Sequence, residues 1–242
     1  MTPQSQPKAA VSTQEKIAPV HLGIILDGNR RWAKERGLPG FEGHRAGWEN
    51  AKKIGDAALT RGVKYLTYFV FSTENWKRSK DEVNYLMNLF FWVATHELDE
   101  LKQKNIRLRV LGEKSGLTPK LIKVLDKAEA ETTNNTGGTL ALCLNYGGEQ
   151  EIASAVAKLI KEGVSAEEVT PEKIAQNLYA PDMPACDLII RTSGEQRISG
   201  FMLYRAAYAE FLFVDKHWPD FSEADLDAAL ADYASRSRRF GK

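Results

Sequence analysis

Apolar residues follow two patterns along the chain, and the patterns alternate. Short continuous apolar runs, rich in β-branched and aromatic residues, predict buried strands. These runs cover residues 20–26, 63–71, 106–111, 140–144, 188–190 and 211–214. Longer stretches with apolar residues at steps of three and four predict helices over residues 44–60, 81–101, 118–133 and 149–161. A last helix begins at a capping-box pattern, Ser222 with Asp225.

Strand and helix alternate throughout, which predicts an α/β fold: a single domain with a central, mostly parallel six-stranded sheet flanked by helices. Residues 30–36 predict a short charged helix, and the glycines and proline of residues 37–43 predict a break after it. In the stretch 81–101, Leu89, Trp92 and Val93 widen the apolar face beyond one stripe. Plain core packing is the simpler interpretation, and the lining of an apolar cavity is the other.

Composition narrows the class of protein. The 242 residues carry 33 Lys+Arg against 32 Asp+Glu, a formal charge of +1, so no general attraction to nucleic acid is expected. No apolar run reaches the roughly 18 residues of a membrane span. Cys143 and Cys186 have no metal-ligand spacing and fit reduced packing residues. Residues 1–18 predict a mobile polar tail before one folded domain over 19–242, and the absence of a signal pattern there favours the cytoplasm.

Three polar clusters follow predicted strands, where ligands of parallel α/β sheets collect. The first is Asp27, Gly28, Asn29, Arg30, Arg31 and Trp32; the second is Ser72, Thr73, Glu74, Asn75, Trp76 and Arg78; the third includes Arg191, Arg197, Ile198 and Ser199. A carboxylate beside arginines suits a phosphate group with a divalent metal. Each cluster alone also fits a turn, solvated arginines or a helix cap. Three together favour a polyanionic ligand.

Two further residues are candidates. His44 fits a phosphate contact or a helix cap, and Glu210 is a carboxylate that enters an apolar strand, which is uncommon unless it is paired or bound to metal. The dinucleotide, P-loop and nucleophile-elbow motifs do not occur. Other chemistry is therefore expected.

The segments HLGIILDGNRRWA, GHRAG, FSTENWKR, NYGG, RTSGEQRIS and AYAEFLF occur in this order. In order and spacing they resemble the cis-prenyltransferases, most closely the undecaprenyl diphosphate synthases. The resemblance spans residues 19–241. It implies a homodimer that repeatedly condenses isopentenyl diphosphate onto an allylic diphosphate such as farnesyl diphosphate. The product would be a polyprenyl diphosphate such as undecaprenyl diphosphate, the lipid carrier precursor for cell-wall synthesis, with peripheral membrane contact for its release.

The resemblance also implies residue roles. Asp27 would support Mg²⁺ and the departing diphosphate with Gly28, Asn29, Arg30, Arg31 and His44, and Glu210 would assist the metal. Asn75, with Ser72, Thr73, Glu74 and neighbouring Trp76, would lie near the proton-loss step, and Asn75 would position rather than act as a base. Arg78, Arg191, Arg197 and Ser199 would hold diphosphates, chiefly that of isopentenyl diphosphate. Arg239, Phe240 and Gly241 would reach the partner subunit.

Some residues depart from the family pattern. Gly40 stands where an arginine is usual, Gly200 replaces a common asparagine, and Arg30 stands where many bacterial members have glycine. The resemblance also implies a tunnel between the helix 81–101 and the sheet, which holds the growing hydrocarbon. Val70 and Leu144 would lie beside this tunnel, and they are larger than the alanines that some members have there. We therefore expect a product shorter than undecaprenyl. Two other classes stay open: a non-catalytic partner subunit that binds diphosphates, and a Rossmann-like phosphohydrolase. The phosphohydrolase interpretation does not explain the wide apolar face of the helix 81–101.

Overall fold

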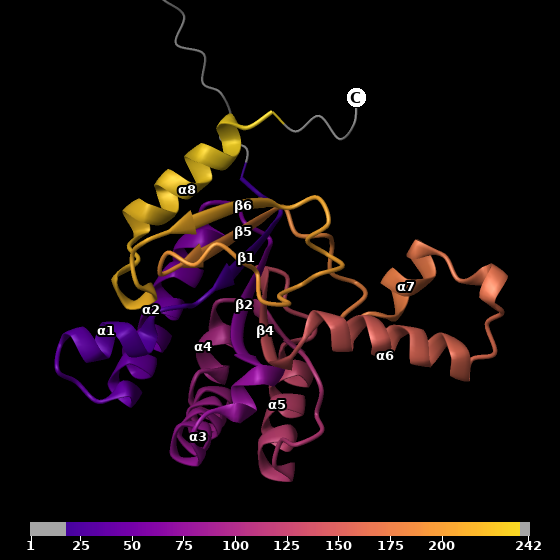
Figure 1. Cartoon of the computed structure of the whole chain (residues 1–242), viewed down its shortest axis with the longest axis horizontal. Helices are drawn as coiled ribbons and strands as arrows, with labels where there is room; N and C mark the ends of the chain where they lie inside the picture. The colour runs from indigo at the N-terminus through magenta and orange to yellow at the C-terminus, as the bar shows by residue number, and fades with distance from the viewer. Residues whose placement is uncertain (1–17, 238–242) are drawn as a thin grey trace, which may run out of the picture.

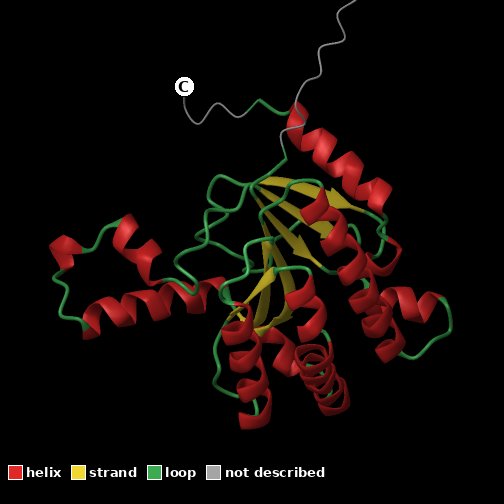
Figure 2. Ribbon diagram, turned by 180° about the vertical axis from the view of Figure 1, so that it is seen from behind, coloured by secondary structure: helices red, strands yellow, loops and turns green. Residues whose placement is uncertain are grey.

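The strands form one sheet in which each neighbouring pair runs parallel (Figures 1 and 2). The structure is a computed structural model and describes residues 18–237. The strands are β1 (His21–Ile25), β2 (Tyr65–Ser72), β3 (Ile106–Leu111), β4 (Gly138–Tyr146), β5 (Leu188–Thr192) and β6 (Glu210–Val214). Their order across the sheet is β3-β4-β2-β1-β5-β6. The predicted α/β fold is confirmed, and the sheet is parallel throughout rather than mostly parallel.

Helices connect β1 to β2, β2 to β3, β3 to β4 and β4 to β5, whereas a segment of turns joins β5 to β6. The helices are α1 (Asn29–Glu35), α2 (Gly40–Thr60), α3 (Lys80–His96), α4 (Leu98–Gln103), α5 (Pro119–Thr132), α6 (Gly148–Lys161), α7 (Pro171–Asn177) and α8 (Glu223–Ser235). Three short 3₁₀ helices, η1 (Thr73–Lys77), η2 (Ala166–Glu168) and η3 (Trp218–Asp220), complete the described elements. Several helices begin where the sequence supplies a cap: the Thr118 hydroxyl accepts the N–H of Leu121, and Ser222 accepts that of Asp225.

The two faces of the sheet are covered differently. Leu22 and Ile24 of β1 and Leu66 and Tyr68 of β2 face a core shared with α2, α4, α5 and α8. On the opposite face, buried side chains of β1, β4 and β5 pack against irregular segments that include Phe201. Helices α6 and α7 pack on each other and extend away from the sheet (Figure 1). Alternate strand residues therefore build two separate cores.

The expected helix 81–101 is two helices, which corrects one prediction. Helix α3 ends at His96, Glu97 caps it, and α4 begins at Leu98. The Thr95 hydroxyl donates to the carbonyls of Phe91 and Trp92, both at 2.9 Å, and so competes for acceptors of the last turn. Such bonding by threonine bends or ends helices, and the apolar pattern continues across the break because α4 packs on β3.

A second correction concerns residues 37–43, where only the first part is a break. Helix α2 already begins at Gly40, four residues before the expected start. A methyl group on Gly43 would lie 2.0 Å from the carbonyl oxygen of Asn29, and one on Gly47 would lie 2.3 Å from Asn29 Oδ1. These glycines therefore allow α1 and α2 to approach closely, and they do not interrupt α2.

Three further points concern helix α7, the two ends of the chain and membrane-spanning helices. Helix α7 was not expected, although Thr170 caps it and Pro171 takes its first position, which are ordinary start signals. The tail predicted for residues 1–18 lies, except for residue 18, outside the described residues, as do Arg239, Phe240 and Gly241. Among the residues that the structure describes, we find no helix with the length and apolar content needed to cross a membrane.

Candidate active site

The predicted polar clusters meet at the carboxyl edge of the sheet. Strands β1, β2 and β5 are neighbours in register, with Ile25 opposite both Phe69 and Arg191. The loops that follow these strands therefore converge. A polar cleft there is lined by Asp27, Gly28, Asn29, Arg30, Arg31, His44, Ser72, Asn75, Arg78, Arg191 and Ser199. These are eleven of the predicted site residues: His44 and ten residues drawn from all three clusters.

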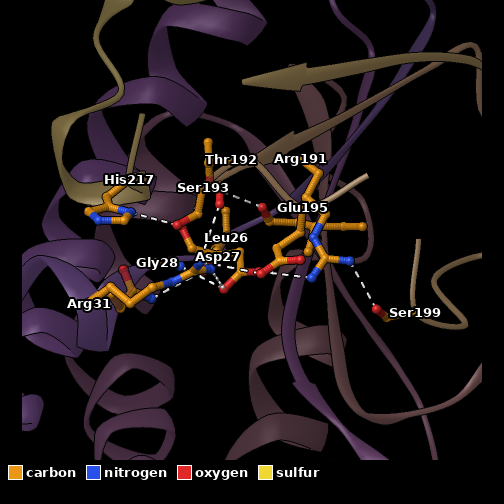
Figure 3. A network of polar contacts seen from close by, with 12 residues as sticks. Leu26, Asp27, Gly28, Arg31, Arg191, Thr192, Ser193, Glu195, Ser199 and His217 are labelled. Atoms are coloured by element: carbon orange, nitrogen blue, oxygen red, sulfur yellow. Dashed lines mark hydrogen bonds and ion pairs between the residues drawn. The ribbon is translucent and has the colours of Figure 1, made fainter. Parts of the chain in front are cut away.

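Asp27 lies between two guanidinium groups, as Figure 3 shows. Its Oδ2 accepts from Arg191 Nη2 at 2.8 Å, and Arg31 Nη2 lies 3.2 Å from its Oδ1. Burial acts to raise the pKa of the carboxyl, but the hydrogen bond and charge of Arg191, with the charge of Arg31, outweigh it and hold the pKa below its usual range. Asp27 is therefore ionised at neutral pH.

The backbone around Asp27 is held from three sides. Its carbonyl oxygen accepts from the Thr192 hydroxyl at 2.7 Å and from the N–H of Trp218 at 3.0 Å. Its Oδ1 accepts the N–H of Gly28 at 2.7 Å. Gly28 has φ of 100°, and a methyl group there would lie 2.6 Å from Ser193 Oγ. Only glycine allows this turn without strain and without that clash.

Arg191 connects Asp27 to the third cluster. Its guanidinium is almost fully buried, and it donates to Ser199 Oγ at 2.9 Å and to the carbonyl of Arg197 at 2.5 Å. The Arg191 Nε–H is buried with no partner among the described residues, so one donor is left for a ligand. The Arg197 side chain points elsewhere and pairs with Glu195 at 2.6 Å, while Ile198 packs into the second core.

Three more predicted cations meet at Glu82, which the sequence did not single out. Glu82 carboxylate oxygens lie 2.9 Å from Arg78 Nη1, 3.3 Å from Arg30 Nη1 and 3.2 Å from His44 Nε2. Burial lowers the pKa of His44, the Arg78 and Arg30 charges lower it further, and the Glu82 hydrogen bond only partly opposes them. His44 is therefore neutral at pH 7. Glu82 stands in the first turn of α3, where an acidic residue is common.

The second cluster forms a tight turn. The Asn75 Oδ1 accepts the N–H of Ser72 at 3.1 Å, which fixes the amide beside the cleft. Thr73 and Glu74 bond to each other at 3.0 Å, and neither is among the cleft residues. Trp76 donates to Asn145 Oδ1 at 2.7 Å and packs edge-on against Phe71. These three residues shape the turn that carries Asn75.

Two further predicted site residues also lie apart from the cleft. Trp32 donates to Asp220 at 2.7 Å and packs against the Arg36 guanidinium. Glu210 begins β6 opposite Leu188, at the amino edge of the sheet, and accepts from Arg236 at 2.8 Å. Asp27 follows the other end of β1, so one chain does not bring Glu210 to it. The direction of β6 thus separates Glu210 from Asp27 within one chain, and a part for Glu210 in a metal site stays a prediction.

An apolar channel lies between α2, α3, α4 and the sheet, beside the polar cleft. Most of its wall is apolar, and it includes Val93 and Ala94 of α3 and Leu144 of β4. Of the residues that widen the apolar face of 81–101, Val93 lines the channel and Leu89 lines the polar cleft, whereas Trp92 is exposed and stacks on His96. The cavity-lining interpretation therefore holds for part of this face, and other residues of α3 pack into the core. The cleft and the channel together suit a ligand with a charged head and a hydrocarbon tail.

Known proteins are similar to this chain over most of its length. A family model described as putative undecaprenyl diphosphate synthase matches residues 25–241. The chain belongs to this prenyltransferase family. A ditrans,polycis-undecaprenyl-diphosphate synthase, (2E,6E)-farnesyl-diphosphate specific, from Aliivibrio fischeri is 45% identical over 93% of this chain and 89% of its own length.

Further relatives differ in the substrates that their names state. The trans,polycis-polyprenyl diphosphate synthase of Thermobifida fusca, (2Z,6E)-farnesyl diphosphate specific, is 45% identical over 99% of this chain and 87% of its own. A crystal structure of lavandulyl diphosphate synthase from Lavandula x intermedia with dimethylallyl diphosphate superposes with a TM-score of 0.88, at 37% identity, covering 93% of this chain and 99% of that one. This chain is thus a prenyltransferase enzyme of the cis-prenyltransferase fold.

Proposed function

We propose that this prenyltransferase elongates an allylic diphosphate, with farnesyl diphosphate as primer, by repeated addition of isopentenyl diphosphate with cis geometry. The observation that carries the proposal is the polar, arginine-lined cleft beside an apolar channel. A diphosphate needs cations and N–H donors, and a growing isoprenoid needs a dry apolar wall. The family membership supports the same reaction.

The cleft offers cations on two sides of Asp27. Arg30, Arg31 and His44 follow β1 or begin α2, and we assign them to the allylic diphosphate. Arg78, Arg191 and Ser199 belong to the other loops, and we assign them with Arg197 to isopentenyl diphosphate. The unpartnered Arg191 Nε–H supports this assignment because a phosphate oxygen would satisfy it.

Each cycle forms one carbon–carbon bond and releases one diphosphate and one proton. The negative charge that develops on the departing diphosphate is where preorganised cations contribute most to the rate. Asn75 is held by Ser72 beside the cleft, and an amide is too weak a base to remove a proton. We therefore give Asn75 a positioning role, with diphosphate or water accepting the proton.

The donor set at Asp27 fits Mg²⁺. Magnesium usually takes one or two protein carboxylates and completes its shell with phosphate oxygens and water. Asp27 is ionised, partly exposed and among arginines that would bring the diphosphate to it. No group of three or more acidic, histidine or cysteine ligands exists within residues 18–237, which agrees with a shared protein–substrate site. When bound, Mg²⁺ would stabilise charge on the leaving diphosphate.

The homodimer is also part of the proposal. Strand β6 forms an edge of the sheet, Phe211 is exposed on it, and Phe211 stacks on Phe213 with centroids 6.3 Å apart. An exposed edge with aromatic residues suits a second copy of the chain. The product would be a polyprenyl diphosphate for a lipid carrier, released at a membrane surface in the cytoplasm.

The test is incubation of the purified protein with farnesyl diphosphate, labelled isopentenyl diphosphate and Mg²⁺, followed by chromatography of the lipid products. We expect labelled polyprenyl diphosphate from the wild type and a loss of at least about 100-fold in Asp27→Ala, since transition-state charge stabilisation of this kind contributes about 3 kcal/mol or more. Asp99→Ala, at an exposed position outside the cleft, is the matched control. Equal incorporation by Asp27→Ala would contradict the assigned role.

A further inference from the structure

Asn145 lies near the carboxyl end of β4, at an irregularity in the pairing of β4 with β2. Phe71 of β2 pairs with Leu144, and Ser72 pairs with Tyr146. Asn145 stands between these two pairs and is therefore the extra residue of a bulge on β4. Its φ is 49°, in the left-handed region that asparagine tolerates better than most residues. Bulges of this kind redirect a side chain and are frequent beside active sites.

The amide of Asn145 joins the loops that follow β2 and β3. Its Nδ2 donates to the carbonyl of Glu113 at 2.9 Å and to that of Ser115 at 2.8 Å, both in the loop between β3 and α5. Its Oδ1 accepts from the Trp76 indole N–H at 2.7 Å, in the turn η1 between β2 and α3. A carbonyl only accepts and an indole N–H only donates, so these partners fix the orientation of the amide. Only 4% of Asn145 is exposed, which places the link out of solvent.

The loop that Asn145 holds is attached to β4 by its backbone as well. The Glu113 N–H donates to the Asn145 carbonyl at 3.1 Å. Gly112 has φ of 140°, and a methyl group there would lie 2.0 Å from the Leu144 carbonyl oxygen. Only glycine allows this approach. The loop therefore gives Asn145 a fixed support from which it bonds to Trp76.

Trp76 passes this restraint to Asn75, the preceding residue of η1. The Trp76 ring packs edge-on against Phe71, with centroids 5.1 Å apart, and a methyl group on Gly116 would lie 3.6 Å from it. Asn75 itself is held by the N–H of Ser72 through one hydrogen bond of 3.1 Å. The link from Asn145 to Trp76 is thus a second restraint on the turn that carries Asn75 beside the cleft.

We propose that Asn145 is a positioning residue for chain elongation, which acts through Trp76 to hold Asn75 where isopentenyl diphosphate loses its proton. The inference rests on the proposed function. In each cycle the terminal alkene carbon of isopentenyl diphosphate bonds to the allylic carbon, and the allylic diphosphate leaves with the electron pair of its C–O bond. The methylene next to the alkene then loses a proton to diphosphate or water, and the electron pair of that C–H bond forms the new double bond. A displaced Asn75 no longer orients this C–H bond, so proton loss slows.

The variants remove the link and little else. Asn145→Gly removes the amide and keeps the backbone, because glycine adopts φ of 49° without strain. Trp76→Phe keeps an aromatic ring beside Phe71 and removes the N–H that Asn145 accepts. Asn105→Gly is the matched control, since Asn105 has φ of 56° but is exposed and precedes β3, at the amino edge of the sheet.

The experiment measures steady-state rates with farnesyl diphosphate, Mg²⁺ and isopentenyl diphosphate that carries hydrogen or deuterium at the reacting methylene. Asn145→Gly should lower kcat about 10- to 100-fold, the range expected from a misplacement of about 1 Å, and leave both KM values nearly unchanged. Its deuterium isotope effect on kcat should exceed that of the wild type, because proton loss becomes the slow step. Trp76→Phe should show the same two changes, and the double variant should lose no more than Asn145→Gly alone. Asn105→Gly should behave as the wild type.

The outcomes separate the inference from the function on which it rests. No incorporation by the folded wild-type protein would overturn the elongation activity, and the role of Asn145 with it. A wild-type kcat and isotope effect in Asn145→Gly would overturn the inference alone. So would a loss of kcat with raised KM values and an unchanged isotope effect, which is the result of a general disturbance of the fold. Circular dichroism and urea unfolding check each variant, and should Asn145→Gly not fold, an unchanged isotope effect in Trp76→Phe would overturn the inference.

Discussion

His21 should make the stability of this protein depend on pH between about 6.5 and about 4, a range that begins above the one in which carboxylates titrate. The ring is fully buried on β1, with Nδ1 3.0 Å from the Pro184 carbonyl and Nε2 2.8 Å from the Thr67 hydroxyl. Since a carbonyl only accepts, Nδ1 carries the proton and Nε2 accepts from Thr67. Burial is the main cause that lowers the pKa to about 4, while the Pro184 carbonyl opposes it and the Arg205 charge adds to it.

The magnitude follows from the two pKa values. The folded-state pKa of about 4 lies below the unfolded value of 6.5, so the unfolded chain binds more protons between these limits. The contribution of His21 is fully present above pH 6.5 and is lost as the pH falls toward 4. At about 1.4 kcal/mol per pKa unit, the total loss is about 3 kcal/mol, of which about 2 kcal/mol falls between pH 7 and pH 4.5.

The assay is reversible urea unfolding at pH 7 and pH 4.5, with the free energy of unfolding from linear extrapolation. His21→Asn keeps a donor for Pro184 and removes the titrating group, so its pH dependence should be smaller by about 2 kcal/mol. His96→Asn, at an exposed position, is the matched control and should behave as the wild type. Identical pH dependence in His21→Asn and wild type would refute the reasoning.

Two further variants address the cleft. Arg191→Lys keeps the charge but cannot reproduce the hydrogen bonds that Arg191 donates to Asp27 and Ser199. Because charge-assisted hydrogen bonds contribute about 1.5–3 kcal/mol, kcat/KM for isopentenyl diphosphate should fall about 10- to 100-fold. A change confined to the allylic substrate would contradict the assignment. Gly40→Arg has space, with the nearest atom 3.9 Å from its Cβ, and should lower KM for the allylic diphosphate several-fold at low salt, whereas Gly40→Gln should not.

The parts of the site that sequence could predict are those in which each chemical group lies at or just after the carboxyl end of a strand. Asp27 and Asn75 follow β1 and β2 closely, and Arg191 lies near the carboxyl end of β5, so parallel neighbours necessarily bring these groups to one edge. Glu210 illustrates the same rule in reverse, because it is the first residue of β6 and therefore lies at the opposite edge. Strand direction, which the apolar run at 211–214 already implied, was the available signal.

Other features depend on contacts between residues far apart in sequence. Glu82 resembles any acidic residue in a first helical turn, and its role depends on Arg30 and His44 arriving from other elements. Gly43 resembles a helix breaker, and only the approach of Asn29 explains it inside α2. The local sequence pattern does not show that these residues come close to Arg30, His44 or Asn29 in the folded chain.

The position of Glu82 between two arginines and a neutral histidine has a kinetic consequence. A diphosphate that enters must compete with a resident carboxylate for Arg30 and Arg78, so part of its binding free energy is offset from the start. The same carboxylate recaptures those arginines when a diphosphate departs, and the cations are not left unpaired in a partly buried site. An enzyme that must discard one diphosphate per cycle gains faster turnover from such an internal competitor than it would from tighter binding.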